Sequence, residues 1–170
     1  DTDTKAESRA LLKFRLPQGW QAVASYARTL DGAFDVRHAH RRFDRPTGWI
    51  AVGHLGVLRE RVAGLQLAVA APLDQHVRRL DLLALLRWTL PTLREITGSL
   101  PERMLIVGAG DPMWRGGLSG PGSVFVHASL PLISRDATSP LLHELMHSVL
   151  GISPGPGGDY LPFIRVSRDG

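Results

Sequence analysis

Apolar and polar residues partly alternate along the first seventy or so residues, and such alternation favours β-strands over helices. The segments with this pattern are 11–16, 21–27, 33–37, 49–57 and 61–70. Asp31-Gly32 lies between two of them and is a typical hairpin signal. Arg59-Glu60-Arg61 predicts a tight loop or a bulge between the last two. We therefore expect residues 1–72 to form a β-rich, antiparallel region.

The pattern changes after Pro72. Residues 75–97 are rich in leucine at a density typical of a largely buried helix, which we expect to be bent or broken near Pro91. Two short apolar runs follow, at 104–108 and 123–128, and each predicts a strand. The glycine-rich segment 111–122 between them lacks the Gly-Lys-Ser/Thr ending of a phosphate-binding loop, which argues against nucleotide binding.

A short helix is predicted over residues 139–151. Ser139 is a favourable N-cap, Pro140 suits the first helical position, and Gly151 can end the helix in a left-handed conformation. Apolar residues at 142, 145, 146 and 149 would bury one side of this helix.

The same segment contains His-Glu-x-x-His, at His143, Glu144 and His147. Histidines four residues apart project from one face of a helix and can share one tetrahedral Zn²⁺. Glu144 can then act as general base toward a metal-activated water without ligating the metal. The alternative is coincidence, a surface or core helix that carries two histidines.

The composition agrees with these predictions and limits the classes of partner that we expect. The chain has 170 residues, 44% hydrophobic and 21% charged, which is typical of a globular domain. Its formal net charge is +4, but the arginines are scattered, so we expect a solvated basic surface and no nucleic-acid partner. It has no cysteine and no apolar run of the ~20 residues that membrane insertion requires.

The first residues, Asp1-Thr2-Asp3-Thr4, include neither Met nor an apolar signal region. This start fits either a processed secreted protein or a trimmed piece of a longer chain. The location stays open between these two origins, with a periplasmic or secreted one favoured.

The order of elements, with His143, Glu144 and His147 on a helix after two strands and a glycine-rich loop, resembles that of gluzincin metallopeptidases. The chain looks like a relative of their alanyl and glycyl aminopeptidase branch over roughly residues 75–161. The resemblance implies an α+β fold with a thermolysin-like catalytic core over residues 73–170, packed against the β-rich region 1–72, and a C-terminal helical subdomain that is missing or altered.

Gly116-Gly117-Leu118-Ser119 is similar to the Gly-x-Met-Glu-Asn or Gly-Gly-Leu-Glu-His motif of that branch, which holds the substrate backbone. Ser119 replaces the glutamate that binds a substrate's free amine in the family. The resemblance therefore implies substrate binding at Gly116, Gly117, Leu118 and Ser119, with endopeptidase or other amide hydrolysis left open.

The third zinc ligand of gluzincins is a glutamate on a following helix, but no glutamate follows Glu144. Gly158-Asp159-Tyr160-Leu161 is similar to the segment that precedes that helix. Three explanations stay open: an incomplete catalytic region, Asp159 as a carboxylate ligand, or a degenerate site. Metzincins fit poorly, because Gly151 is four residues after His147 where three are required and no third histidine follows.

The remaining candidates are weaker. His38 and His40 are two apart and would share one face of a strand, but no third ligand accompanies them. Tyr26 and Tyr160 are the two tyrosines that could assist catalysis. The sequence thus predicts a zinc-dependent peptide hydrolase acting on a peptide or protein; the alternative is an inactive or incomplete zinc-binding or peptide-binding domain of the same family.

Overall fold

The structure is a computed structural model that describes residues 10–37 and 46–150, and over this part of the chain the fold is α+β. The elements in chain order are β1 (Ala10–Leu12), β2 (Gln21–Ala24), β3 (Ala27–Arg28), β4 (Phe34–Val36), β5 (Ile50–Gly53), β6 (Leu55–Val62), β7 (Leu65–Pro72), α1 (Arg79–Thr97), β8 (Arg103–Ala109), β9 (Gly117–Gly120), β10 (Ser123–His127) and α2 (Pro140–Leu150).

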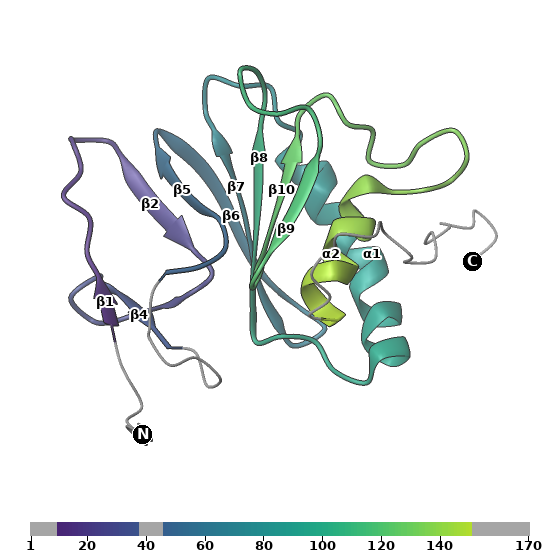
Figure 1. Ribbon diagram of the computed structural model, residues 1–170, viewed down its shortest axis with the longest axis horizontal. Helices are drawn as coiled ribbons and strands as arrows, with labels where there is room; N and C mark the ends of the chain where they lie inside the picture. The colour runs from purple at the N-terminus through teal and green to yellow at the C-terminus, as the bar shows by residue number, and fades with distance from the viewer. Residues whose placement is uncertain (1–9, 38–45, 151–170) are drawn as a thin grey trace, which may run out of the picture.

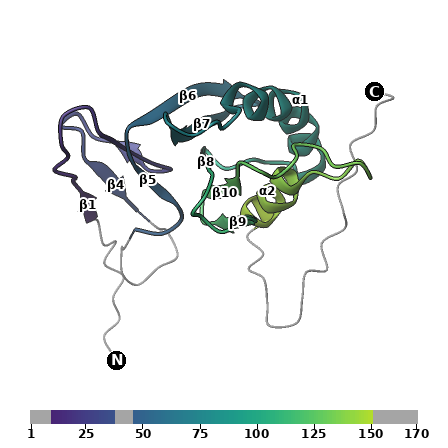
Figure 2. The ribbon, with the colours of Figure 1, turned by 90° about the horizontal axis from the view of Figure 1, so that it is seen from above.

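The main sheet has five strands in the order β6-β7-β8-β10-β9. β7, β8 and β10 run parallel, and an antiparallel strand lies at each edge. β8 and β10 are apolar almost without alternation because both faces of these central strands are covered. Helices α1 and α2 cover one face, and β2 and β5 lie toward the other (Figures 1 and 2).

Two apolar clusters result from this arrangement. The larger one joins α1 and α2 to the sheet and includes Leu86, Leu90, Ile106 and Leu145, all without solvent exposure. The smaller one lies on the opposite face, where Val23 of β2 and Ala51 of β5 pack against Leu105 and Phe125. The larger cluster therefore fixes the position of α2, the helix that carries His143 and His147.

The sequence predicts a helix that is bent or broken near Pro91; α1 is not broken there and continues to Thr97. Pro91 is on the exposed side of the helix, and the neighbouring Leu90 and Leu93 are buried in the core. Burial of these leucines outweighs the loss of one helical hydrogen bond. The helix ends at Gly98, whose left-handed conformation lets its N–H donate to the carbonyl of Arg94 at 2.8 Å.

The loop predicted at Arg59-Glu60-Arg61 is wrong, because these residues lie inside β6. The turn comes later, at Ala63 and Gly64, where both residues have positive φ (50° and 85°), as a two-residue hairpin turn requires. The charged run instead alternates across the strand: Glu60 pairs with Arg87 of α1, while Arg59 and Arg61 lie on the other face.

The other predicted strands are found in part. The segment 21–27 divides into β2 and β3, which belong to different sheets, and 49–57 divides between β5 and the start of β6. The hairpin at Asp31-Gly32 joins β3 to β4, and Gly32 has the positive φ (81°) that the turn needs. The glycine-rich segment 111–122 contains a strand, β9, that its composition did not predict. His38 and His40 lie outside the described residues. No helix in the described part of the chain is long and apolar enough to cross a bilayer.

Candidate functional site

Helix α2 is capped at its N-terminus as the sequence predicts, and Gly151, the predicted C-cap, lies outside the described residues. The N–H of Leu142 donates to Oγ of Ser139 at 3.3 Å, and Pro140 is the first helical residue. Leu141, Leu142 and Leu145 are buried against the sheet, and this packing holds the helix against β9 and β10. His143 and Glu144 are half-buried and lie where the helix meets β9, the edge strand.

The two histidines converge on one point. The Nε2 atoms of His143 and His147 lie 3.3 Å apart, and the ring planes are inclined at 77° with centroids 4.9 Å apart. His147 is only 4% exposed, so the surrounding core restricts its ring. An (i, i+4) spacing on α2 therefore brings two imidazole nitrogens together, as the sequence predicts.

This spacing fits zinc. A tetrahedral ion about 2.0–2.1 Å from each of two imidazole nitrogens holds those nitrogens about 3.3 Å apart. Without a metal, the same spacing allows one ring N–H to donate to the other ring. Among residues 10–37 and 46–150, no group of three His, Asp or Glu side chains comes together, so these residues supply two ligands and not a full set.

Glu144 is held against β9. The N–H of Ser119 donates to Oε2 of Glu144 at 2.9 Å. A Cβ on Gly117 would lie 2.6 Å from Cγ of Glu144, so only glycine leaves room for this side chain as it stands. The glycine of the predicted motif thus has a direct physical role, which is to let the edge strand approach the carboxylate.

The four predicted substrate-binding residues lie together at this edge. Gly117, Leu118 and Ser119 belong to β9, and Gly116 precedes it. The Trp114 ring lies against Gly116, where a Cβ would be 2.2 Å from its nearest atom.

Two residues that the sequence did not single out also hold β9. Nε1 of Trp49 donates to the Leu118 carbonyl at 2.9 Å, and Oγ of Ser148 donates to the Gly120 carbonyl at 3.0 Å. Ser148 directly follows His147, so its place on the helix could have suggested a role. Trp49 is 69 residues from Leu118 in sequence, and nothing local signals the contact.

The proposed assisting groups are not both at this site. The hydroxyl of Tyr26 donates to the Thr47 carbonyl at 2.9 Å and lines a cleft on the face of the sheet opposite α2. Tyr26 is therefore not placed to assist at His143. Asp159 and Tyr160 lie outside the described residues.

His127 at the end of β10 is a second buried histidine, only 3% exposed. Its Nδ1 accepts from the Ser129 N–H at 3.2 Å, and its Nε2 lies 3.5 Å from Oδ1 of Asp111. Arg115, with a smaller contribution from His127, lowers the pKa of the Asp111 carboxyl. The cluster anchors the loop that leads into β9.

Comparisons with known proteins indicate the fold. No family model and no curated protein sequence matches the chain. The chain is similar in structure to a crystal structure of an aminopeptidase N family protein from Idiomarina loihiensis, with a TM-score of 0.64 and 15% sequence identity. The similarity covers 86% of this chain but only 28% of that one, so the chain corresponds to little more than a quarter of the larger protein and shares its fold over that part.

Proposed function

We propose that the chain forms the metal-binding and substrate-binding part of a zinc-dependent peptide hydrolase of the gluzincin type, with a thermolysin-like core. The observation that carries this proposal is the 3.3 Å separation of the Nε2 atoms of His143 and His147. Two imidazoles this close, one turn apart, beside a half-buried carboxylate, form the first part of a hydrolytic zinc site. The shared fold with part of an aminopeptidase N family protein supports the same assignment.

When bound, Zn²⁺ supplies Lewis acidity, which lowers the pKa of water toward about 7 and polarises a carbonyl oxygen. Glu144 takes the proton from the water as that water attacks a peptide carbonyl, and passes it to the leaving amine. His143 and His147 would hold the ion through their Nε2 atoms, and the burial of His147 fixes its ring.

The substrate backbone lies along β9 as an added strand. In the structure the N–H of Ser119 donates to Glu144, so this donor becomes available to a peptide carbonyl when Glu144 turns toward the attacking water. The N–H of Ser119 therefore couples two events: it binds the peptide carbonyl as Glu144 leaves it to act as general base. Ser119 offers no negative charge to a free amino terminus, which favours internal peptide bonds over strict aminopeptidase cleavage.

A third ligand is needed to complete the zinc site. Asp159 or a group outside this chain would supply it, since Asp and Glu oxygens bind zinc at about 2.0–2.2 Å. Because the described residues supply only two ligands, a second candidate function is a zinc-binding or peptide-binding domain without turnover. The two functions differ in whether a bound peptide is cleaved.

The test uses the full chain with and without Zn²⁺. Metal content is measured by anomalous scattering at the zinc edge, and peptide hydrolysis with an unbiased mixture of peptides. We expect zinc at His143 and His147, and Glu144→Gln should keep the metal but lose at least about a hundredfold in kcat/KM. Full activity in Glu144→Gln would rule out the mechanism. Zinc binding with no hydrolysis by the unaltered chain would establish the second function.

A further inference from the structure

A cleft lies on the face of the main sheet opposite α1 and α2. It has a volume of about 580 Å³ and separates β2 and β3 from β6, β7 and β8. This volume is in the range of small-molecule sites in proteins. The cleft shares no lining residue with the His143 and Glu144 site.

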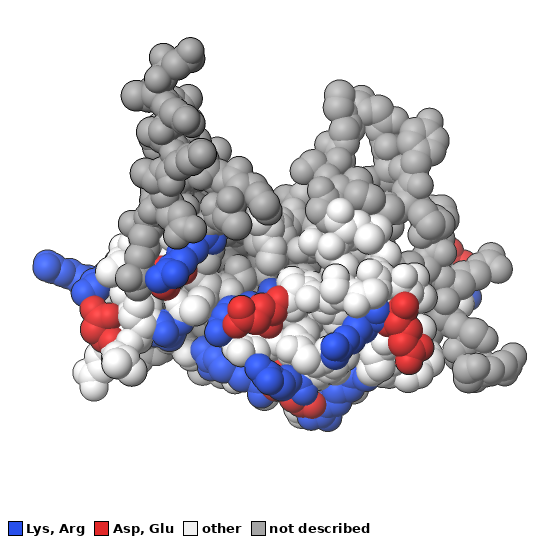
Figure 3. Space-filling model, turned by 90° about the horizontal axis from the view of Figure 1, so that it is seen from below, with Lys and Arg blue, Asp and Glu red and all other residues white. Residues whose placement is uncertain are grey.

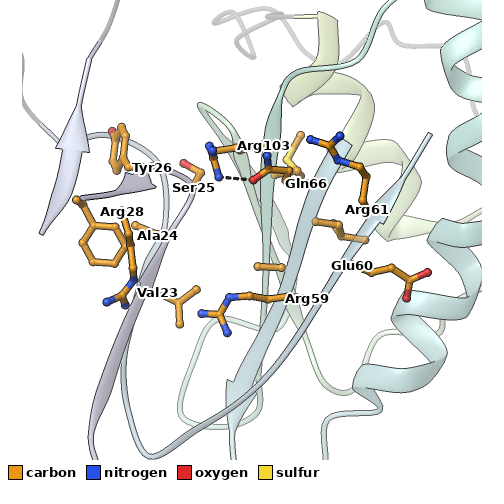
Figure 4. Close-up of a pocket in the computed structure, with 14 residues that line it drawn as sticks. Val23, Ala24, Ser25, Tyr26, Arg28, Arg59, Glu60, Arg61, Gln66 and Arg103 are labelled. Atoms are coloured by element: carbon orange, nitrogen blue, oxygen red, sulfur yellow. Dashed lines mark hydrogen bonds between the residues drawn. The ribbon is translucent and has the colours of Figure 1, made fainter. Parts of the chain in front are cut away.

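The strand register places three arginines on the sheet side of this cleft. Arg61 pairs with Gln66, and Gln66 pairs with Arg103, so these residues form a row across β6, β7 and β8. Arg59 lies two residues before Arg61 and therefore on the same face. Figure 4 shows Arg61 and Arg103 on either side of Gln66, with Arg59 extending from β6 into the cleft.

The spacing of this row suits an extended anion. Alternate residues on a strand are about 6.6 Å apart, and two strand intervals span about 9.5 Å, so the three guanidinium groups can reach two or more negative groups of one molecule. Arginine binds phosphate and carboxylate through paired N–H groups. Ala68, opposite Arg59 on β7, leaves the space between the arginines open.

The positive charge on this wall is only partly neutralised. Nη2 of Arg103 lies 3.1 Å from Oε1 of Glu102, its neighbour in the chain. Glu60 is the one acidic residue of the lining, and its carboxylate turns away to Arg87 on α1. The side chains of Arg59 and Arg61 are exposed and make no hydrogen bond or ion pair with any described residue. In the view from below, Lys and Arg side chains lie along the middle of the molecule, interspersed with Asp and Glu (Figure 3).

The opposite wall is already fixed. Arg28 donates to the Ala22 carbonyl and stacks over the Phe34 ring, 4.5 Å from its centroid. Tyr26 is held by its hydrogen bond to Thr47. A ligand therefore meets an ordered wall on one side, which limits the entropy lost there on binding. On the other side it meets the side chains of Arg59 and Arg61, which have no ion-pair partner among the described residues.

We propose that this cleft binds a small polyanion, a molecule with at least two phosphate or carboxylate groups, through Arg59, Arg61 and Arg103. Gln66 orients Arg103 by accepting its hydrogen bond. The site is separate from the zinc-dependent activity proposed above and does not depend on it.

The test is isothermal titration calorimetry of the full chain at two ionic strengths, with pyrophosphate, citrate and orthophosphate as probes. Pyrophosphate and citrate distinguish a phosphate ligand from a carboxylate ligand, and orthophosphate should bind more weakly than either because it offers one group. We expect Arg59→Gln with Arg61→Gln to weaken binding at least about tenfold. Binding should also weaken as salt is raised.

The matched control is Arg78→Gln with Arg135→Gln, which removes the same formal charge outside the cleft and should leave binding unchanged. Since two of the probes also bind divalent metals, the titration is repeated with His143→Gln, which should not alter it. Equal loss in the control, loss with His143→Gln, or no binding of any probe at low salt would overturn the proposal. Arg59→Lys with Arg61→Lys keeps the charge and, as a milder variant, should bind with intermediate affinity.

Discussion

Gly117 and Glu144 are in such close contact that a single added methyl group would displace the carboxylate. A Cβ at Gly117 would lie 2.6 Å from Cγ and 3.3 Å from Cδ of Glu144. The edge strand and the helix therefore meet at the one side chain that the proposed mechanism needs. Ser119, two residues along β9, holds the same carboxylate through its N–H.

Gly117→Ala should impair hydrolysis more than zinc binding. Glu144 must turn away from β9 or α2 must move, and overpacking of this kind costs about 1–3 kcal/mol. We expect at least a roughly tenfold lower kcat/KM with zinc stoichiometry retained, because a 1.4 kcal/mol change is a factor of about ten.

Gly110→Ala is the matched control, since the nearest atom to its added Cβ lies at 3.7 Å, an ordinary contact distance. Both variants are compared by steady-state kinetics, metal analysis and thermal unfolding. Unchanged kinetics in Gly117→Ala would mean that the carboxylate works from another position.

Zinc should stabilise the fold through His143. A ligand that binds only the native state raises the free energy of unfolding by about 2.7 kcal/mol at a hundred times its Kd. The unaltered chain should show a higher Tm with added Zn²⁺, and His143→Gln should abolish that increase. His127→Gln is a useful comparison, because His127 is also buried but lies outside α2; a lost zinc response there as well would count against the His143 and His147 site.

Much of α2 could be predicted from local sequence. Ser139 and Pro140 mark its start, and His143 and His147 share a face because four residues make about one turn. These features depend on neighbours along the chain. The closeness of Gly117 to Glu144 could not be predicted in the same way, since it depends on how α2 packs across the edge of the sheet.

In the segments whose secondary structure the sequence did not predict, long-range packing outweighs the local conformational preference of the residues. Arg59-Glu60-Arg61 has the polarity of a loop, yet it forms part of β6 because each side chain finds solvent or a partner, such as Arg87 for Glu60. β9 is rich in glycine, which disfavours strands in isolation, and pairing with β10 supplies its order. Trp49 reaches β9 from a distant segment, and no periodicity indicates such a contact.

Acid stability should depend in part on Asp31. Lys13, whose Nζ lies 2.5 Å from Oδ2, and then Thr29 lower the pKa of Asp31 from 3.8 to about 2. A carboxyl whose pKa is depressed by folding stabilises the native state above its unfolded value, and this contribution disappears as the pH falls through the folded pKa. The loss is therefore expected between pH about 4 and about 2.

Asp31→Asn should flatten the dependence of stability on pH within that window and leave the difference between neutral pH and pH 5 unchanged. The effect is small and should shrink in high salt, because both partners are exposed. Asp74→Asn is a suitable control at an exposed aspartate. Urea unfolding at closely spaced pH values measures both variants, and an identical acid slope in Asp31→Asn and the unaltered chain would contradict the prediction.

Pro91 is predicted to lower the stability of α1 even though the helix runs through it. A proline inside a helix removes one backbone donor and strains the preceding turn, at a cost of about 3 kcal/mol. It also restricts the unfolded chain, which offsets about 1 kcal/mol. Pro91→Ala should therefore raise the free energy of unfolding by about 1–2 kcal/mol, since Pro91 is exposed and alanine leaves the buried Leu90 and Leu93 in place. Thr92→Ala, on the exposed side one residue later, controls for helix propensity alone and should change stability by less than about 1 kcal/mol.

Urea titration measures the free energy of unfolding of the three proteins. In a regular helix the Arg87 carbonyl would accept from the N–H of residue 91, which proline lacks. Equal or lower stability in Pro91→Ala would therefore mean that this carbonyl is already satisfied in another way.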